Sequence, residues 1–171
     1  MRVLVTGGVR SGKSRHAETL LGGSPATYVA PGPAADDADW AERIAAHRAR
    51  RPAAWTTLET HDLAAALATP GPVIVDCLGT WLTAQLDDRG LWDAPSVAVD
   101  DAVETLVEEA VTALAARHDP TVLVTNEVGL GVVPAHRSGR LFRDLLGLVN
   151  QRTAAACDQV HLVIAGRVLV L

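Results

Sequence analysis

The sequence predicts an α/β fold in which a mainly parallel sheet carries helices on both faces. Strand-like and helix-like segments alternate along the chain, and this alternation is typical of parallel strands joined by helices. Most of the strand-like segments are apolar or β-branched along most of their length, as expected for strands that are covered on both sides. With 171 residues there is room for one compact core, so we expect a single domain over residues 1–171.

Five segments are expected to form buried strands, and a sixth is expected to form an edge strand at the end of the chain. The buried strands are predicted over Val3–Thr6, Thr27–Ala30, Val73–Cys77, Val122–Asn126 and Val160–Ile164, and the edge strand over Val168–Leu171. Helices are predicted over Lys13–Leu21, Asp37–Arg50, His61–Leu67, Gly79–Leu86, Val97–Arg117 and about Gly139–Cys157. Asp87–Gly90 and Trp92–Ser96 are expected to form a surface loop between two helices.

A glycine-rich loop follows the first strand and precedes the first helix. Its residues are Gly7, Gly8, Val9, Arg10, Ser11, Gly12, Lys13 and Ser14, and they match G-x-x-x-x-G-K-[ST] at every fixed position. Backbone N–H groups of such a loop surround a β-phosphate, and the slim ammonium group of the lysine reaches the β- and γ-oxygens. Lys13 is the only lysine in a chain with fourteen arginines. The loop predicts a P-loop domain that binds a nucleoside triphosphate.

Two oxygen-bearing side chains are candidates for holding Mg²⁺. The hydroxyl of Ser14 belongs to the glycine-rich loop, and Asp76 comes near the end of the third predicted strand. In P-loop enzymes a carboxylate in that place holds the metal directly or through water. A second interpretation is that Asp76 only begins the loop that follows, as a helix cap would. We expect Mg²⁺ at Ser14 and Asp76.

Composition excludes several other classes of function. The net charge of −5 argues against a surface that binds nucleic acid. No apolar run approaches the roughly 20 residues of a membrane-spanning helix, and the N-terminus enters the first strand without a signal peptide. Cys77 and Cys157 have neither CxxC nor metal-ligand spacing, which indicates reduced core thiols in a cytoplasmic protein.

A basic face is expected at the end of the helix over Asp37–Arg50. Arg43, His47 and either Arg50 or Arg51 fall at spacings that place them on one side of a helix. The neighbouring positive charges would lower the pKa of His47 and keep its imidazole neutral and nucleophilic. The arginines would also balance the charge of a triphosphate. From spacing alone, a solvated helix end with an incidental histidine is the stronger interpretation.

Four blocks of sequence resemble a known family. They are Gly7-Gly8-x-Arg10-Ser11-Gly12-Lys13-Ser14, Arg43-Ile44-x-x-His47-Arg48-x-x-Arg51-Pro52, Thr125-Asn126-Glu127-Val128-Gly129 and Val149-Asn150-Gln151-Arg152. In this order and spacing they resemble the bifunctional adenosylcobinamide kinase / adenosylcobinamide-phosphate guanylyltransferase of cobalamin biosynthesis. The first block is generic, whereas the second and third are specific to that family.

The resemblance implies a RecA-like P-loop NTPase fold, a homotrimer and two reactions. ATP or GTP phosphorylates adenosylcobinamide, and GMP from GTP is then transferred to adenosylcobinamide phosphate through a guanylyl-histidine. His47 matches the histidine of the family and is therefore expected to be the nucleophile. An apolar face on Val97–Leu114 is available either to a trimer contact or to the core.

Further nucleotide contacts are expected from residues between the second and third predicted strands. Arg48 and Arg51 would contact phosphates, and Glu59 would accept hydrogen bonds from guanine or ribose, although Glu59 is also explained as an exposed acid. Ala30, Pro31 and Gly32 stand where the family often has a hydroxyl residue after alanine, so a contact there must come from the backbone or be absent. Glu127 is equally compatible with a position in the nucleotide site and with a role in an ion pair.

Two other functions remain compatible with parts of the sequence. A small-molecule kinase would need the glycine-rich loop and Asp76 but would have no use for His47. A GTPase-type switch would need an Asn-Lys-x-Asp guanine motif, which this chain lacks because its only lysine is Lys13.

Overall fold

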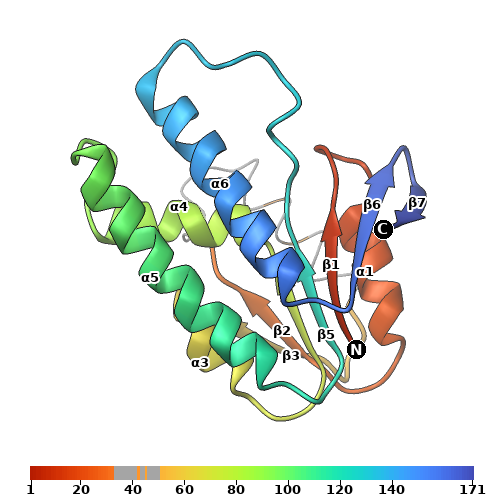
Figure 1. Ribbon diagram of the computed structural model, residues 1–171. Helices are drawn as coiled ribbons and strands as arrows, with labels where there is room; N and C mark the ends of the chain where they lie inside the picture. Colours follow the sequence, from red (N-terminus) through yellow and green to blue (C-terminus); the bar gives the residue numbers. More distant parts are fainter. Residues whose placement is uncertain (33–41, 43–44, 46–50) are drawn as a thin grey trace.

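The computed structural model describes residues 1–32, 42, 45 and 51–171. One sheet of seven strands organises these residues, in the order β3-β2-β4-β5-β1-β6-β7 (Figure 1). Six strands run parallel, and the last strand is antiparallel to β6. The strands are β1 (Arg2–Thr6), β2 (Thr27–Ala30), β3 (Thr56–Glu59), β4 (Val73–Asp76), β5 (Thr121–Val124), β6 (Gln159–Ile164) and β7 (Arg167–Val170).

Helices cover both faces of this sheet, as Figure 1 shows. The helices are α1 (Lys13–Leu21), α3 (Leu63–Leu67), α4 (Leu78–Asp88), α5 (Ser96–Ala115) and α6 (Arg137–Ala155). Buried side chains of α1 form one cluster with the sheet, and those of the other four helices form a second cluster on the opposite face. The predicted α/β fold class, with a mainly parallel sheet between helices, is confirmed.

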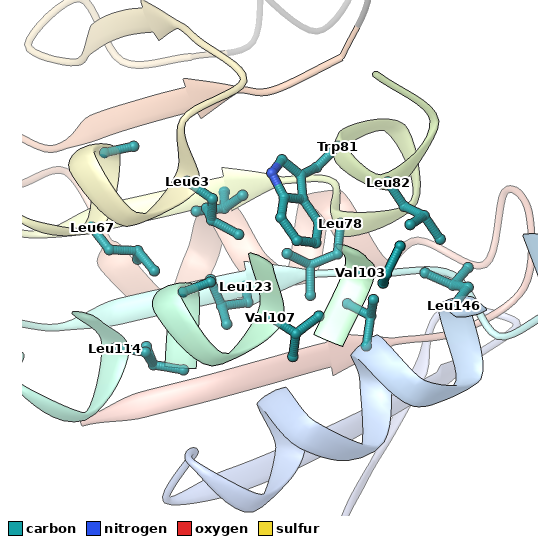
Figure 2. Packing of buried hydrophobic residues seen from close by; sticks show 14 of the residues in the cluster. Leu63, Leu67, Leu78, Trp81, Leu82, Val103, Val107, Leu114, Leu123 and Leu146 are labelled. Atoms are coloured by element: carbon teal, nitrogen blue, oxygen red, sulfur yellow. The ribbon is translucent and has the colours of Figure 1, made fainter. Parts of the chain in front are cut away.

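Side chains of the strands point alternately to the two faces of the sheet and so contribute to both clusters. Leu4 of β1 packs with α3 to α6, while Val3 and Val5 on either side of it pack with α1, because successive side chains of a strand point to opposite faces. Figure 2 shows the larger cluster, where Leu78 and Trp81 of α4 lie beside side chains of α3 and α5. None of the described helices combines the length and the apolar character needed to cross a bilayer.

The strand β3 was not predicted. Its sequence, Thr-Thr-Leu-Glu, contains one apolar residue, and it forms an edge of the sheet where three of its four side chains are exposed. The pattern of a buried strand is therefore missing from it. Its structure depends on pairing with β2, in which Thr27 lies opposite Thr56.

Several boundaries differ from the predicted ones because of tertiary contacts. Asp87 and Asp88 belong to α4 rather than to a loop, since they accept hydrogen bonds from Trp92 and His61. The helix α6 begins at Arg137, whose guanidinium donates to the carbonyls of Trp92 and Ala94. The predicted helix Asp37–Arg50 lies outside the described residues, except for Glu42 and Ala45, which are helical.

Candidate nucleotide and metal site

The glycine-rich loop joins β1 to α1 in a backbone conformation that depends on glycine. Gly7 has a φ of 156°, and a Cβ atom on it would lie 2.4 Å from the carbonyl oxygen of Val163 in β6. Gly12 has a φ of 98° directly before α1, and Arg10 also has a positive φ. Positive φ values favour glycine and cost strain in other residues. The loop therefore fits closely against β6 and turns sharply into the helix.

Lys13 is the first residue of α1, and its side chain is buried with 7% exposure. Its Nζ donates to the carbonyl oxygen of Gly8 over 3.1 Å, so the ammonium group lies inside the curve of the loop. The hydroxyl of Ser11 is buried and has no hydrogen-bond partner among the described residues. The N-terminus of α1 adds its positive dipole end at the same place. This arrangement can hold an anion.

The carboxylate of Asp76 lies between two hydroxyl groups. Ser14 Oγ is 3.5 Å from its Oδ1, and the hydroxyl of Tyr28 donates to its Oδ2 over 2.7 Å. Tyr28 is 2% exposed, and its burial, with the charge of Asp76, raises the pKa of its phenol well above the ordinary value. The phenol therefore stays protonated and donates to Asp76 at any physiological pH.

The register of the sheet aligns three predicted site residues at one edge. Ala30, the last residue of β2, lies opposite Glu59, the last residue of β3. On the other side of β2, Val29 lies opposite Val75, which directly precedes Asp76. The carboxyl ends of neighbouring parallel strands are where ligands bind in α/β sheets. Glu59 is exposed at this edge.

The segment after β2 packs against the start of α4. Pro31 is buried, and a Cβ atom on Gly32 would lie 2.9 Å from Cβ of Thr80. A side chain at position 32 would therefore push the segment away from α4. Only the backbone of residues 30–32 can offer hydrogen-bonding groups to a ligand.

Arg51 is anchored to the sheet beside this edge. Its guanidinium carbon lies 3.3 Å from the centre of the Tyr28 ring, and its Nη1 donates to Thr57 Oγ1 over 3.0 Å. Its Nε is buried and has no hydrogen-bond partner in the described part of the chain. His47 and Arg48, which were predicted beside it, lie outside the described residues.

Comparison with known proteins bears on this arrangement. A family model described as cobinamide kinase / cobinamide phosphate guanyltransferase matches residues 3–171. The chain belongs to this family. The bifunctional adenosylcobalamin biosynthesis protein CobU of Salmonella typhimurium is 42% identical over 97% of both chains. CobP of Pseudomonas aeruginosa, which has the same description, is 42% identical over 97% of this chain and 94% of its own length. The fold agrees with the P-loop fold expected for this family.

Residues of the third and fourth blocks of the family resemblance contact one another near Cys77, the residue after Asp76. Thr125 Oγ1 donates to Asn150 Oδ1 over 2.6 Å, and Asn150 Nδ2 donates to the carbonyl of Asn126 over 3.0 Å. Asn126 Nδ2 lies 3.9 Å from Sγ of Cys77, the residue after Asp76. These contacts tie the end of β5 to α6 and to the end of β4. The two blocks therefore support the carboxyl edge of the sheet.

Glu127 lies between this support and the glycine-rich loop. Its amide donates to the carbonyl of Gly7 over 3.3 Å, and its Oε1 accepts from the amide of Gly129 over 2.6 Å. The side chain of Glu127 thus stabilises the turn in which it lies.

Sequence reasoning missed Tyr28, Thr57 and Thr80 as residues that shape the site. The available signal was slight: Tyr28 is the only tyrosine of the chain and lies in a strand that precedes a turn. Its contact with Asp76 joins residues 48 positions apart, and local patterns carry no information on such pairs.

Proposed function

We propose that this chain catalyses both reactions named for its family. In the first, ATP or GTP transfers its γ-phosphoryl group to a hydroxyl of adenosylcobinamide. In the second, GMP from GTP is transferred to adenosylcobinamide phosphate, which gives adenosylcobinamide-GDP and pyrophosphate. The observation that carries this proposal is the meeting of Lys13, Ser14 and Asp76 at the carboxyl edge of the sheet in a chain that matches the family over residues 3–171.

Phosphate groups would be held by the glycine-rich loop of residues 7–14. Its backbone N–H groups and the ammonium group of Lys13 supply positive charge without a base contact, so ATP and GTP are both suitable phosphoryl donors. The buried Ser11 hydroxyl and Arg51 Nε have no partner among the described residues. Both can donate to phosphate oxygens.

The residues present fit Mg²⁺. Among the described residues no group of three or more His, Cys, Asp and Glu side chains could hold a metal ion. Mg²⁺ bound with a nucleotide needs fewer protein ligands, because it takes one or two hard oxygens and completes its shell with phosphates and water. Ser14 Oγ and Asp76 Oδ1, 3.5 Å apart, are such a pair. Bound there, the ion would neutralise charge on the phosphates.

His47 would carry the GMP group between the two substrates. Its neutral imidazole attacks the α-phosphorus of GTP, a P–N bond forms, the bond to the bridging oxygen breaks, and pyrophosphate leaves. An oxygen of adenosylcobinamide phosphate then attacks the same phosphorus and the P–N bond breaks. Two easier displacements thus replace a direct reaction between two anions. Arg48 and Arg51 would balance phosphate charge, Glu59 would bind guanine or ribose, and the backbone of Ala30, Pro31 and Gly32 would border the nucleotide.

The assembly proposed is a homotrimer in the cytoplasm. The apolar face of α5 does not support it, because Val99, Val103 and Val107 are buried in the core of the same chain. Leu130 and Val132, in the connection before α6, are 91% and 94% exposed and are better candidates for a subunit contact. A mass measured by light scattering at micromolar concentration tests the trimer, and a monomeric mass counts against it.

The test of the function is a labelling experiment with GTP that carries the label in its α-phosphate. The protein should retain label that is stable to base and labile to acid, as a P–N bond to imidazole is. His47→Ala should lose the label and the transfer of GMP, while phosphorylation of adenosylcobinamide by ATP survives in part. His61→Ala is the matched control, since it removes a partly exposed histidine that contacts Asp88, and it should keep both activities.

Three results contradict parts of the proposal. Label that persists on His47→Ala, or that maps to His16, His61 or Lys13, removes His47 as the nucleophile. Phosphorylation without any protein label indicates a small-molecule kinase only. Slow hydrolysis of GTP without transfer to either corrinoid indicates a GTPase-type switch.

A further inference from the structure

Tyr28 contacts two parts of the proposed site at once. Its hydroxyl donates to Asp76 Oδ2 over 2.7 Å, and its ring lies 3.3 Å below the guanidinium carbon of Arg51. The side chain is 2% exposed and lies in the cluster between the sheet and α1. A buried tyrosine usually forms a hydrogen bond through its hydroxyl. Here the acceptor is the carboxylate of Asp76, whose other oxygen faces Ser14.

The hydroxyl determines which oxygen of Asp76 is available. Because the phenol donates to Oδ2, the carboxylate is held with Oδ1 toward Ser14 Oγ, 3.5 Å away. Hydrogen bonds to a ligating carboxylate commonly contribute 10- to 100-fold to metal affinity or activity. Removal of the hydroxyl would remove the hydrogen bond that holds Oδ2 of Asp76.

The ring of Tyr28 holds Arg51 against strands β2 and β3. Thr57, which accepts a hydrogen bond from Arg51, lies opposite Tyr28 in the register of β2 and β3. A guanidinium stacked on an aromatic face and bonded to the neighbouring strand has little freedom. Arg51 follows His47 by four residues in the sequence.

We propose that Tyr28 is a positioning residue for both reactions: its hydroxyl orients Asp76 toward Mg²⁺, and its ring fixes Arg51, which follows His47 by four residues in the sequence. This inference rests on the proposed function, since it takes Asp76 as a metal ligand and His47 as the nucleophile. In this role Tyr28 acts through its contacts with Asp76 and Arg51.

The hydroxyl is tested with Tyr28→Phe, which keeps the ring under Arg51. The Mg²⁺ concentration that half-saturates phosphorylation should rise about tenfold or more, while kcat at saturating Mg²⁺ changes much less. Binding of a fluorescent ATP analogue provides a readout apart from turnover. Its affinity with EDTA should be unchanged, whereas the gain in affinity on adding Mg²⁺ should shrink. Thr153→Val is the matched control: it removes another buried hydroxyl, which donates to Val149 in α6, and it should leave the Mg²⁺ dependence unchanged.

The ring is tested with Tyr28→Leu under saturating Mg²⁺. Labelling of the protein by α-labelled GTP should slow at least tenfold more in Tyr28→Leu than in Tyr28→Phe, while phosphorylation by ATP is similar in both. If Tyr28→Leu does not fold, Tyr28→Met supplies the same test, because methionine is a flexible apolar side chain that fills irregular space but has no aromatic face for Arg51 to stack on. Equal labelling rates in Tyr28→Phe and the ring-contact variant overturn this half of the inference.

Asp76→Asn separates failure of the inference from failure of the proposed function. If Asp76→Asn raises the Mg²⁺ requirement and Tyr28→Phe does not, the metal site stands and the positioning role of the hydroxyl is wrong. If neither change affects the Mg²⁺ requirement, Asp76 is no metal ligand, and both the metal assignment and the inference fall.

Discussion

The ammonium group of Lys13 reaches back to its own loop, where its Nζ lies 3.1 Å from the carbonyl oxygen of Gly8. Lys13 is 7% exposed, so little free space surrounds its side chain. A point charge fits into this space, whereas a planar guanidinium is wider and needs more partners.

Lys13→Arg should therefore abolish the binding and use of triphosphates although it conserves charge. The measurements are binding of a fluorescent ATP analogue and phosphorylation of adenosylcobinamide. The reverse exchange at an exposed position, Arg89→Lys on the surface after α4, is the control and should bind nucleotide normally. Near-normal turnover in Lys13→Arg would place the phosphates elsewhere in the protein.

Gly7→Ala should destabilise the fold by roughly 1 to 3 kcal/mol, the cost of a strained backbone position. The new Cβ would meet the carbonyl oxygen of Val163 at 2.4 Å, and this oxygen belongs to the backbone of β6, which cannot move aside cheaply. Gly8→Ala is the matched control, because a Cβ there has no atom within 4 Å. Thermal unfolding of the two variants should show a lower Tm for Gly7→Ala alone. Equal Tm values would mean that the loop does not press against β6.

Arg117 and Arg152 should differ in their contribution to stability. Arg117 donates to the carbonyls of Thr69 at 2.8 Å and Gly71 at 2.5 Å, and also to that of Leu67, so it joins the end of α5 to the turn before β4. Arg117→Ala should cost about 2 to 3 kcal/mol, because charged donors to partly buried acceptors are lost. Arg152 pairs with Glu108 on the surface, and Arg152→Ala should cost at most about 1 kcal/mol.

Denaturant unfolding of both variants checks this difference. A cost for Arg152→Ala as large as that for Arg117→Ala would show that the carbonyl contacts contribute little.

Asp158 should give the protein a stability that depends on pH in the acid range. Its carboxylate accepts from the side chain of Arg2 at 2.8 Å and from the backbone of Arg2 at 2.7 Å, and these bonds lower the pKa of Asp158. A lowered pKa of an acid stabilises the folded state above the unfolded pKa of about 4, and the effect is lost as pH falls through the lower folded value. Asp158→Asn should therefore have a lower Tm than the parent chain at pH 7.

The difference in Tm between the parent chain and Asp158→Asn should shrink as the pH is lowered below about 4. A difference that is constant from pH 7 to pH 2 would assign the effect to the shape of the side chain rather than to its charge.

Local sequence patterns predicted the parts of this protein that local physics determines. The glycine-rich loop, the strands and the layers of the sheet follow from short patterns, and all of them are found in the structure. The strand β6, predicted as buried, is only partly buried. The strand β3 was missed because its edge position removes the apolar signature of a buried strand. The link from Tyr28 to Asp76 was missed because it depends on the register between β2 and β4. The placement of His47 stays a prediction.

The turn between β6 and β7 offers a natural probe of the glycine-rich loop. Ala165 and Gly166, which form this turn, have φ values of 49° and 75°, as in the tight two-residue hairpins that suit a twisted sheet. The amide of Gly166 donates to the carbonyl oxygen of Ser11 over 2.8 Å. Hydrogen exchange at that single amide should thus record how often the loop separates from the hairpin. A nucleotide that steadies the loop would slow this exchange at an amide whose hydrogen-bond acceptor is the carbonyl oxygen of Ser11.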